Sequence, residues 1–287
     1  MKISSSQKLI SLAVAVAGAA GLVSCAQADE LNFISPVSNP LYFEDANVAT
    51  EIRPLFIQHF IPKSFITGGG DARVYAVQLR YAVTERLAII ATKDGFIEFN
   101  PKTIPHQDGW ADLAAGIKYA LIRDVENHFM LTPGIKLELP TGNQRVFQGS
   151  GSGVWDIFVS TAKAWDKIEL QANVGVTIPN DFDKKTSLAH YSVQLGYNAC
   201  RWFKPFVSAN AFTVLSEGKG PALDSEGFDL INFGSGNASG QTQVALGGGF
   251  RTEITKSCQF GLSGEVAVGH PKGLFDSRII ADISYRF

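Results

Sequence analysis

The stretch Ile168-Glu169-Leu170-Gln171-Ala172-Asn173-Val174-Gly175-Val176-Thr177-Ile178 alternates between two kinds of residue along its whole length. Successive side chains of a β-strand point to opposite faces, so the apolar residues, Ile168 to Ile178, share one face. An α-helix would scatter the same residues around its axis. The stretch therefore predicts a strand with one apolar face and one polar face.

The same alternation recurs from residue 51 to the end of the chain in blocks of about ten residues. It is clear in 73–82, 110–121, 129–139, 187–199, 259–268 and 277–287, and weaker in 51–60, 86–94, 154–164, 204–214 and 242–252. With 168–178, these blocks predict about twelve strands. Their lengths are close to the roughly 9–11 residues that a tilted membrane-spanning strand needs.

The connections between these blocks alternate in length. The long ones are 61–72, 95–109, 140–153, 179–186, 215–241 and 269–276, and the short ones are 83–85, 122–128, 164–167, 200–203 and 253–257. Outer-membrane barrels have an even strand count, short periplasmic turns and longer external loops. A soluble sandwich of Greek keys has no reason to sort its loops in this way. We therefore predict an all-β fold, an antiparallel up-and-down transmembrane β-barrel in the bacterial outer membrane.

The last block carries the strongest local signal. Ile283, Tyr285 and the terminal Phe287 continue an alternation with polar residues. This ending resembles the C-terminal signal by which bacterial outer-membrane proteins are recognised for insertion, which makes the barrel-assembly machinery an expected partner. Aromatic residues are expected at both membrane interfaces, and several stand at predicted strand ends or turns, namely Trp110, Trp155, Trp165, Trp202 and Phe203.

The N-terminus has the order of a secretory signal peptide. Lys2 and Lys8 precede an apolar run, and small residues follow it. Two processing sites compete: Ala26-Gln27-Ala28 before Asp29 is an A-x-A cleavage site, whereas Leu22-Val23-Ser24-Cys25 resembles a lipoprotein box that would leave Cys25 lipidated. We favour a signal peptide over 1–28. No later apolar run approaches the roughly 20 residues of a membrane-spanning helix.

Two segments do not read as strands. Residues 29–50 alternate poorly and are expected to fill the lumen as a short plug or to lie at the periplasmic mouth, ahead of a barrel over 51–287. The long loop 215–241 holds Phe228, Leu230, Ile231 and Phe233 among its glycines. It is too apolar for a plain solvated loop, so we expect it to fold into the mouth or to touch lipopolysaccharide.

The residues that carry chemistry are sparse. A net charge of −2 gives no reason to expect nucleic acid as a partner. The five histidines are scattered without metal-ligand spacing, and Gly149–Gly153 lacks the Lys and the following helix of a phosphate loop, so we expect no metal site and no cofactor. His190 and Ser192 share a face but lie on one strand, so the sequence predicts no enzyme.

Many predicted inward faces carry charge of both signs. The tentative lumen-lining residues are Arg80, Asp112, Lys118, Lys136, Glu138, Glu169, Arg251 and Glu265. Buried charges need partners, so these side chains either line a polar path with some selectivity or fill a narrow interior with ion pairs. Cys200 and Cys258 fall at predicted periplasmic turns, and a disulfide between them stays open.

Three short motifs give the chain a family resemblance. Leu139-Pro140-Thr141-Gly142 ends one strand, the loop 149–153 leads into Trp155-Asp156, and Arg278 precedes the closing Tyr285-Arg286-Phe287. In these motifs the chain resembles the outer-membrane family named for the MetA pathway of phenol degradation, over most of residues 51–287. The resemblance implies a β-barrel that takes up hydrophobic compounds, and it supplies no catalytic residues.

Two functions follow from these expectations. The first is a pore or transporter for a small solute, with outer-membrane lipids as its surroundings. The alternative is a structural or surface-interaction barrel with a filled lumen. The sequence names neither the solute nor the oligomeric state, and it leaves open whether the lumen is open.

Overall fold

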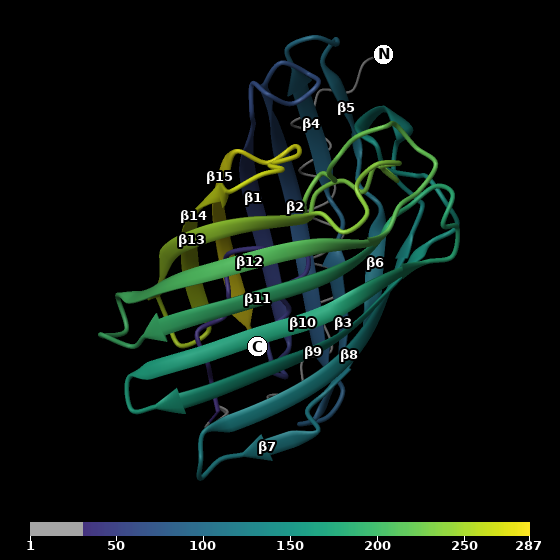
Figure 1. Ribbon diagram of the computed structural model, residues 1–287. Helices are drawn as coiled ribbons and strands as arrows, with labels where there is room; N and C mark the ends of the chain where they lie inside the picture. The colour runs from purple at the N-terminus through teal and green to yellow at the C-terminus, as the bar shows by residue number, and fades with distance from the viewer. Residues whose placement is uncertain (1–30) are drawn as a thin grey trace, which may run out of the picture. The chain divides into compact units, whose positions relative to one another are not determined.

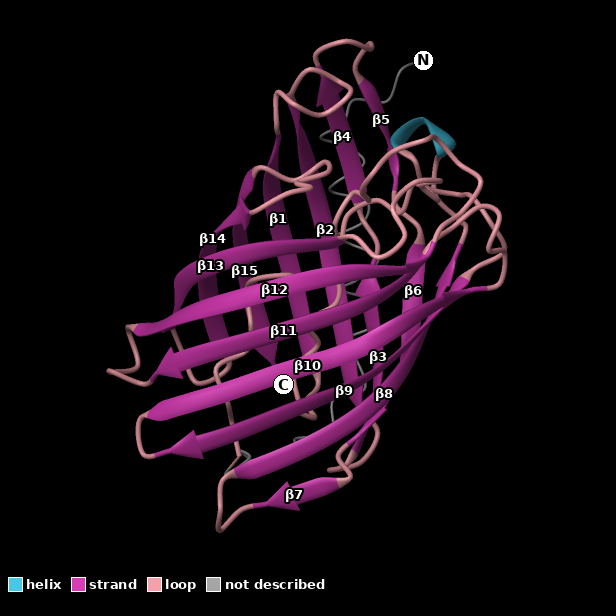
Figure 2. Cartoon of the chain, viewed as in Figure 1, coloured by secondary structure: helices cyan, strands magenta, loops and turns pink. Residues whose placement is uncertain are grey.

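A computed structural model describes residues 31–287, so the predicted signal peptide over 1–28 lies outside the described residues. Strands make up almost all of the regular structure, and the helical exception is the short 3-10 helix η1, Gln144–Val146 (Figure 2). The strand segments are β1 Glu51–Ile61, β2 Gly70–Ala82, β3 Leu87–Lys93, β4 Phe96–Pro101, β5 Gln107–Trp110, β6 Leu113–Tyr119, β7 Ile122–Asp124, β8 Phe129–Leu139, β9 Val154–Trp165, β10 Ile168–Pro179, β11 Ser187–Tyr197, β12 Lys204–Ser216, β13 Thr242–Glu253, β14 Cys258–Val268 and β15 Ser277–Arg286.

The segments form one antiparallel sheet that closes on itself. β1 pairs with β2 along one edge and with β15 along the other, from Glu51 opposite Arg286 to Phe60 opposite Ser277. β3 and β4 are two halves of one strand opposite β2, β5 and β6 divide the next strand, and β7 is a short addition beside β8. The barrel therefore has twelve strands in up-and-down order, which confirms the predicted fold class.

The break between β3 and β4 is a local bulge. Asp94 turns its carboxylate back to accept a hydrogen bond from the Val77 amide at 2.9 Å. Gly95 follows with a φ of +109°, and a Cβ there would meet the Tyr75 carbonyl oxygen at 2.4 Å, so only glycine fits. Beyond the bulge, β4 and β5 form a hairpin inside 95–109, a segment that the sequence predicted as a loop. That prediction was wrong because the proline-rich stretch hides two very short strands.

The two ends of the barrel differ in the length of their connections. At one end, called the long-loop end, the connections are 62–69, 102–106, 140–153, 180–186, 217–241 and 269–276. At the short-turn end they are 83–86, 120–128, 166–167, 198–203 and 254–257. Figure 1 shows the long loops at the top and upper right of the barrel and the short turns at the left and bottom. No helix among residues 31–287 is long and apolar enough to cross a membrane.

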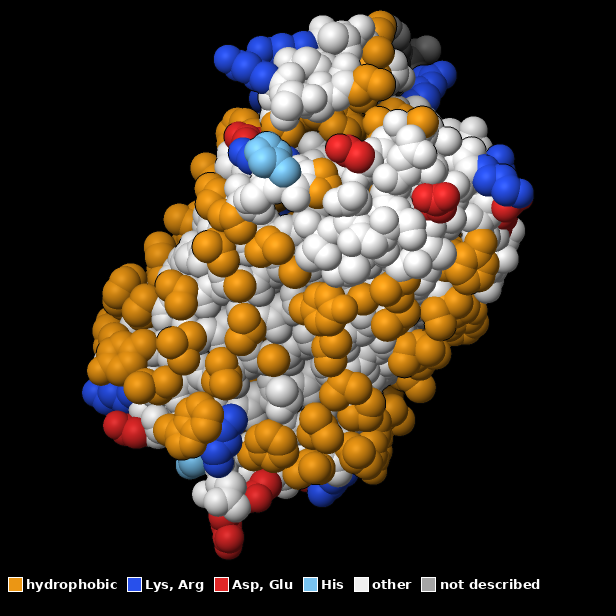
Figure 3. Space-filling view, viewed as in Figure 1, with side chains coloured by type: hydrophobic (Ala, Val, Ile, Leu, Met, Phe, Trp, Pro, Cys, Tyr) orange, Lys and Arg blue, Asp and Glu red, His pale blue; other side chains and the backbone are white. Residues whose placement is uncertain are grey.

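The outer face of the wall is apolar. Large aliphatic side chains such as Ile117, Val174 and Leu195 are about half exposed there. Figure 3 shows hydrophobic side chains over the barrel wall, with charged side chains gathered towards the two ends. Such a large exposed apolar surface is expected of a wall that faces lipid.

An aromatic row lies on the outer face towards the long-loop end. Phe56, Tyr75, Phe96 and Trp110 stand opposite one another on β1, β2, β4 and β5, and two pairs have ring centroids 5.3 and 5.5 Å apart. The next outward-facing row is polar and consists of Gln58, Arg73, Glu98 and Asp108. This change from aromatic to charged residues is typical of the boundary between acyl chains and headgroups.

A charge on the outer face tests this assignment. We expect Val193→Arg, at a half-exposed position midway along β11, to lower the free energy of unfolding by about 2–4 kcal/mol, because arginine is costly at the bilayer midplane. Denaturant titration of the refolded barrel in lipid vesicles measures it. The control is Ser239→Arg in an exposed loop, for which we expect almost no change. Equal effects of the two variants would contradict a lipid-facing wall.

Candidate functional site

The inward faces of the strands are buried and carry many polar side chains among apolar ones. Seven of the eight tentative lumen-lining residues are at most 5% exposed: Arg80, Asp112, Lys118, Lys136, Glu169, Arg251 and Glu265. Glu138 is partly buried, and its side chain pairs with Lys93 at 2.8 Å. Asp112 is the one that does not reach the middle of the lumen: it accepts hydrogen bonds from the amides of Gly142 and Gly149, 2.8 and 2.7 Å away, and so holds a loop.

Residues 31–50, here called the lumen segment, run through the interior of the barrel. Only Asn32 of the segment is exposed, and none of it forms a strand. In Figure 1 its purple trace passes behind the front strands, within the ring of the sheet. A buried chain outside any sheet must find other partners for its backbone groups.

Side chains of the wall supply those partners. Gln171 and Gln194 donate to the Ile34 carbonyl at 2.5 and 3.1 Å, and Glu169 accepts from the Ile34 amide at 2.7 Å. Similar bonds reach carbonyls farther along the segment, from Gln78 to Pro40, Lys136 to Leu41, Ser160 to Glu44 and Thr132 to Ala46. The lumen segment is therefore held by wall side chains at many points along its length.

One ionic cluster joins the segment to β2 and β6. Glu44 pairs with Arg80 at 2.7 Å and with Lys118 at 2.6 Å, and Lys118 also pairs with Asp45 at 3.0 Å. All four side chains are almost fully buried. The two carboxylates of the segment thus neutralise two cations of the wall that would otherwise be desolvated without a partner.

A second cluster lies within the wall and also grips the segment. The Asp282 carboxylate bridges two arginines, Arg251 at 2.8 Å and Arg53, whose Nε donates at 2.7 Å. Arg251 also donates to the Ser35 carbonyl at 2.6 Å, and Arg53 donates to that of Pro36 at 2.5 Å. One carboxylate and two backbone carbonyls therefore share two buried guanidinium groups.

Two inward-facing glycines make room for the segment. A Cβ on Gly261 would lie 2.7 Å from a methyl of Val37, and a Cβ on Gly196 would lie 3.0 Å from the end of Ile34. Either contact is closer than ordinary packing allows. The wall is thus fitted to the segment by shape as well as by charge.

The loop 217–241, here called the cap loop, closes the long-loop end. Phe228, Leu230 and Ile231 are at most 4% exposed, and the Phe228 ring lies 4.5 Å from that of Phe212 and 4.7 Å from that of Phe275. The sequence predicted that these apolar residues either fold into the mouth or touch lipopolysaccharide. In the structure they fold into the mouth. They pack against the inner wall because lipid is out of their reach there.

Arg278 and Glu265 connect the cap loop with the lumen segment. Arg278 pairs with Asp229 of the cap loop at 2.6 Å and with Glu265 of β14 at 2.6 Å. The Asn39 amide donates to the same Glu265 carboxylate at 3.4 Å. One buried ion pair of the wall therefore contacts both elements that fill the barrel.

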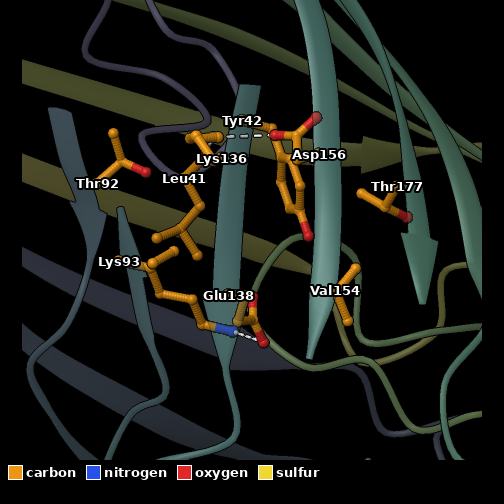
Figure 4. Close-up of a pocket in the computed structure, with 10 residues that line it drawn as sticks. Leu41, Tyr42, Thr92, Lys93, Lys136, Glu138, Val154, Asp156 and Thr177 are labelled. Carbon is orange, nitrogen blue, oxygen red and sulfur yellow. Dashed lines mark hydrogen bonds and ion pairs between the residues drawn. The ribbon is translucent and has the colours of Figure 1, made fainter. Parts of the chain in front are cut away.

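Little empty space remains between them. A cavity of about 20 Å³ lies beside Tyr42, between the ion pairs Lys93–Glu138 and Lys136–Asp156 (Figure 4). That volume holds roughly one water molecule.

The sequence did not reveal the partners of the inward-facing residues. His190 Nε2 donates to the Asp156 carboxylate of β9 at 2.9 Å, and the Tyr42 ring of the segment lies tilted against the His190 ring with centroids 4.9 Å apart. Alternation places a residue on a face but says nothing of what stands opposite it across the lumen. Cys200 and Cys258 are free thiols, and no group of residues within 31–287 has the arrangement of a metal site.

Known proteins resemble this chain in sequence and in fold. A model of the family described as "Putative MetA-pathway of phenol degradation" matches residues 64–274. No curated protein matches the chain by sequence. Among solved structures, the COG4313 outer membrane channel from Pseudomonas putida F1 has a TM-score of 0.59 at 13% identity, over 89% of this chain and 100% of the channel. The NanC porin has a TM-score of 0.52 at 9% identity, over 83% of this chain and 100% of the porin. At these identities the likeness concerns the fold, an outer-membrane β-barrel.

The buried Asp282 cluster leads to a stability prediction. Asp282→Asn removes the carboxylate that pairs with both Arg53 and Arg251 and leaves the two guanidinium groups buried. We therefore expect a loss of about 3–5 kcal/mol in the free energy of unfolding. The matched control is Asp183→Asn, which breaks an exposed pair with Lys219 of 2.8 Å and should cost less than about 1 kcal/mol. Denaturant titration in detergent micelles measures both. Comparable losses would show that the cluster is not the anchor described here.

The cap loop leads to a prediction of pH dependence. Burial raises the pKa of the Glu226 carboxyl, although the amides of Ser235 and Phe233 donate to it and oppose the shift. A carboxyl whose pKa is higher in the folded state binds more protons when folded, so stability rises as pH falls from neutral towards the unfolded-state pKa near 4.5. We expect the unfolding midpoint of the wild type, relative to Glu226→Gln, to increase between pH 7.5 and 5. A constant difference over that range would refute the assignment.

Proposed function

The chain belongs to this family of the MetA pathway of phenol degradation, and from that membership and the geometry of the lumen we propose that it transports a small solute across the outer membrane. The path runs along the barrel axis and opens when the lumen segment leaves the interior. The long-loop end faces outward and the short-turn end faces the periplasm. The proposal agrees with the two solved structures that share the fold, since one is an outer membrane channel and the other is a porin.

One observation carries this proposal. The lumen segment joins the barrel through side-chain contacts alone and pairs with no strand of the sheet. It can therefore leave without breaking a single strand pairing. Elements outside the sheet can open locally while the rest of the protein stays folded.

Hydration of the wall charges lowers the free-energy cost of such an opening. With the segment present, the wall charges Arg80, Lys118 and Arg251 are dry and depend on their partners. With the segment absent, water would enter and solvate the same charges, which offsets much of the cost of losing the ion pairs. A wall lined with charge is compatible with a closed, filled state and with an open, hydrated one.

The opposing function is a structural barrel whose interior never opens. The buried lumen segment and the buried cap loop favour it, because both occupy the interior in the state described.

We also propose that the protein is not an enzyme. Within residues 31–287, the imidazole of His190 contacts Asp156, but its second nitrogen has no partner and the nearby Ser192 hydroxyl accepts from Asn39 instead. No activated nucleophile results from that arrangement.

Residues Ile283 and Tyr285 lie half-exposed on the outer face of β15, in keeping with the proposed recognition of Ile283, Tyr285 and Phe287 by the assembly machinery.

A reversible crosslink tests whether the segment gates the path. A Cβ on Gly196 would lie 3.9 Å from the Ile34 Cβ, within the range of a disulfide, so Ile34→Cys with Gly196→Cys can fasten the segment to the wall. Cys25, Cys200 and Cys258 are first replaced by serine. We expect the oxidised double variant to be silent in planar bilayers and to conduct in discrete steps after reduction.

The single variant Ile34→Cys is the control and should conduct irrespective of redox state. Silence of every variant and of the wild type, with refolding verified, would favour the permanently filled barrel. Equal conductance of the oxidised and reduced double variants would show that the solute does not pass where the segment lies. Liposome swelling with sugars and with phenols then compares solute classes.

A further inference from the structure

A second, larger cavity is formed by two loops of the long-loop end. It has a volume of about 530 Å³ and opens at the long-loop end, where the loop 62–69 meets the loop 269–276. The backbone holds the two loops together, since the Asp276 amide donates to the Phe60 carbonyl at 3.0 Å. The depression is open to its surroundings rather than enclosed. This depression is called the rim cavity below.

The lining of the rim cavity is cationic and rich in donors. Its polar side chains are Lys63, Ser64, His270, Lys272 and Asp276. Lys272 pairs with Asp276 at 2.8 Å, which leaves the Lys63 ammonium as the net charge. Lys63 and His270 form no side-chain hydrogen bond or ion pair within residues 31–287. Figure 3 shows charged and histidine side chains gathered over the loop between β14 and β15.

Apolar side chains continue from the cavity down the outer face. Val268 directly precedes the loop 269–276, and Val266 and Val268 on β14 and Ile279 on β15 are 51%, 36% and 48% exposed. These residues belong to the face that meets lipid. Because the loop 269–276 continues directly from Val268, an amphiphile lying against these residues would have its polar head beside the His270, Lys272 and Asp276 side chains of the cavity lining.

We propose that the rim cavity binds the phosphate group of a phosphorylated lipid of the outer leaflet. Lys63, Lys272, His270 and the Ser64 hydroxyl donate to the phosphate oxygens, while the acyl chains lie along Val266, Val268 and Ile279. Lysine ammonium groups and hydroxyls commonly donate hydrogen bonds to phosphate. A phosphate also supplies the negative charge that would pair with the Lys63 ammonium. The site depends on the membrane orientation proposed above but not on any passage through the lumen.

Native mass spectrometry of the full mature protein in detergent can test the site. The probes are diphosphorylated lipid A, the same lipid A after removal of its phosphates, and inorganic phosphate. We expect lipid A to bind the wild type, and binding to weaken at least tenfold in Lys63→Gln with Lys272→Gln, because one lost charge-assisted hydrogen bond costs about tenfold or more in affinity. The matched control, Lys167→Gln with Lys256→Gln, removes the same charge at the short-turn end and should bind normally.

Each outcome decides one part of the proposal. Equal binding of both double variants overturns the site, as does equal binding of the dephosphorylated lipid. Inorganic phosphate that displaces lipid A at comparable concentrations overturns the lipid assignment and leaves a site for the free anion. If the double variant does not fold, the exposed and unpaired Lys63 is changed alone, to Glu. A barrel that never conducts can still bind lipid A, so the two proposals fail separately.

Discussion

The structure depends on one constraint, namely that a charge inside a narrow barrel must have a partner. Asp282 meets it by standing between Arg53 and Arg251, and the pair Glu44 and Asp45 meets it for Arg80 and Lys118. Because the outer faces of the strands are apolar over the middle of the wall, many polar residues of the strands point inward. The interior must then hold either water or a chain that offers matching charges and carbonyls.

The lumen segment is such a chain. Its carbonyls accept from glutamines, serines and arginines of the wall, and its two acids neutralise cations of β2 and β6. None of these contacts belongs to the sheet, so the barrel and its filling are built from separate sets of interactions. Arg278 and Glu265 are where the filling from the two ends meets, since the cap loop and the lumen segment share them. The sheet can therefore stay intact in the open, hydrated state that we propose.

Much of the architecture could be predicted before any coordinates. The alternation in 168–178 predicted β10, and the loop lengths predicted the two unlike ends and the even strand count. The hairpin of β4 and β5 was missed because its strands are only six and four residues long and stand among prolines. The bulge at Asp94 and Gly95 divides β3 from β4, and a glycine in a run of loop residues does not announce a bulge.

The sequence by itself determined which face each residue occupies, because the two-residue period of a strand is a local property of the backbone. It therefore placed Arg80, Lys118 and Arg251 on the inward face without naming any partner. Only the tertiary structure decided that Arg80 meets Glu44 and that Arg53 meets Asp282, 229 positions away along the chain. Closure of the sheet brings such residues together, and charges find partners across the lumen by distance in space, which no local pattern in the sequence records.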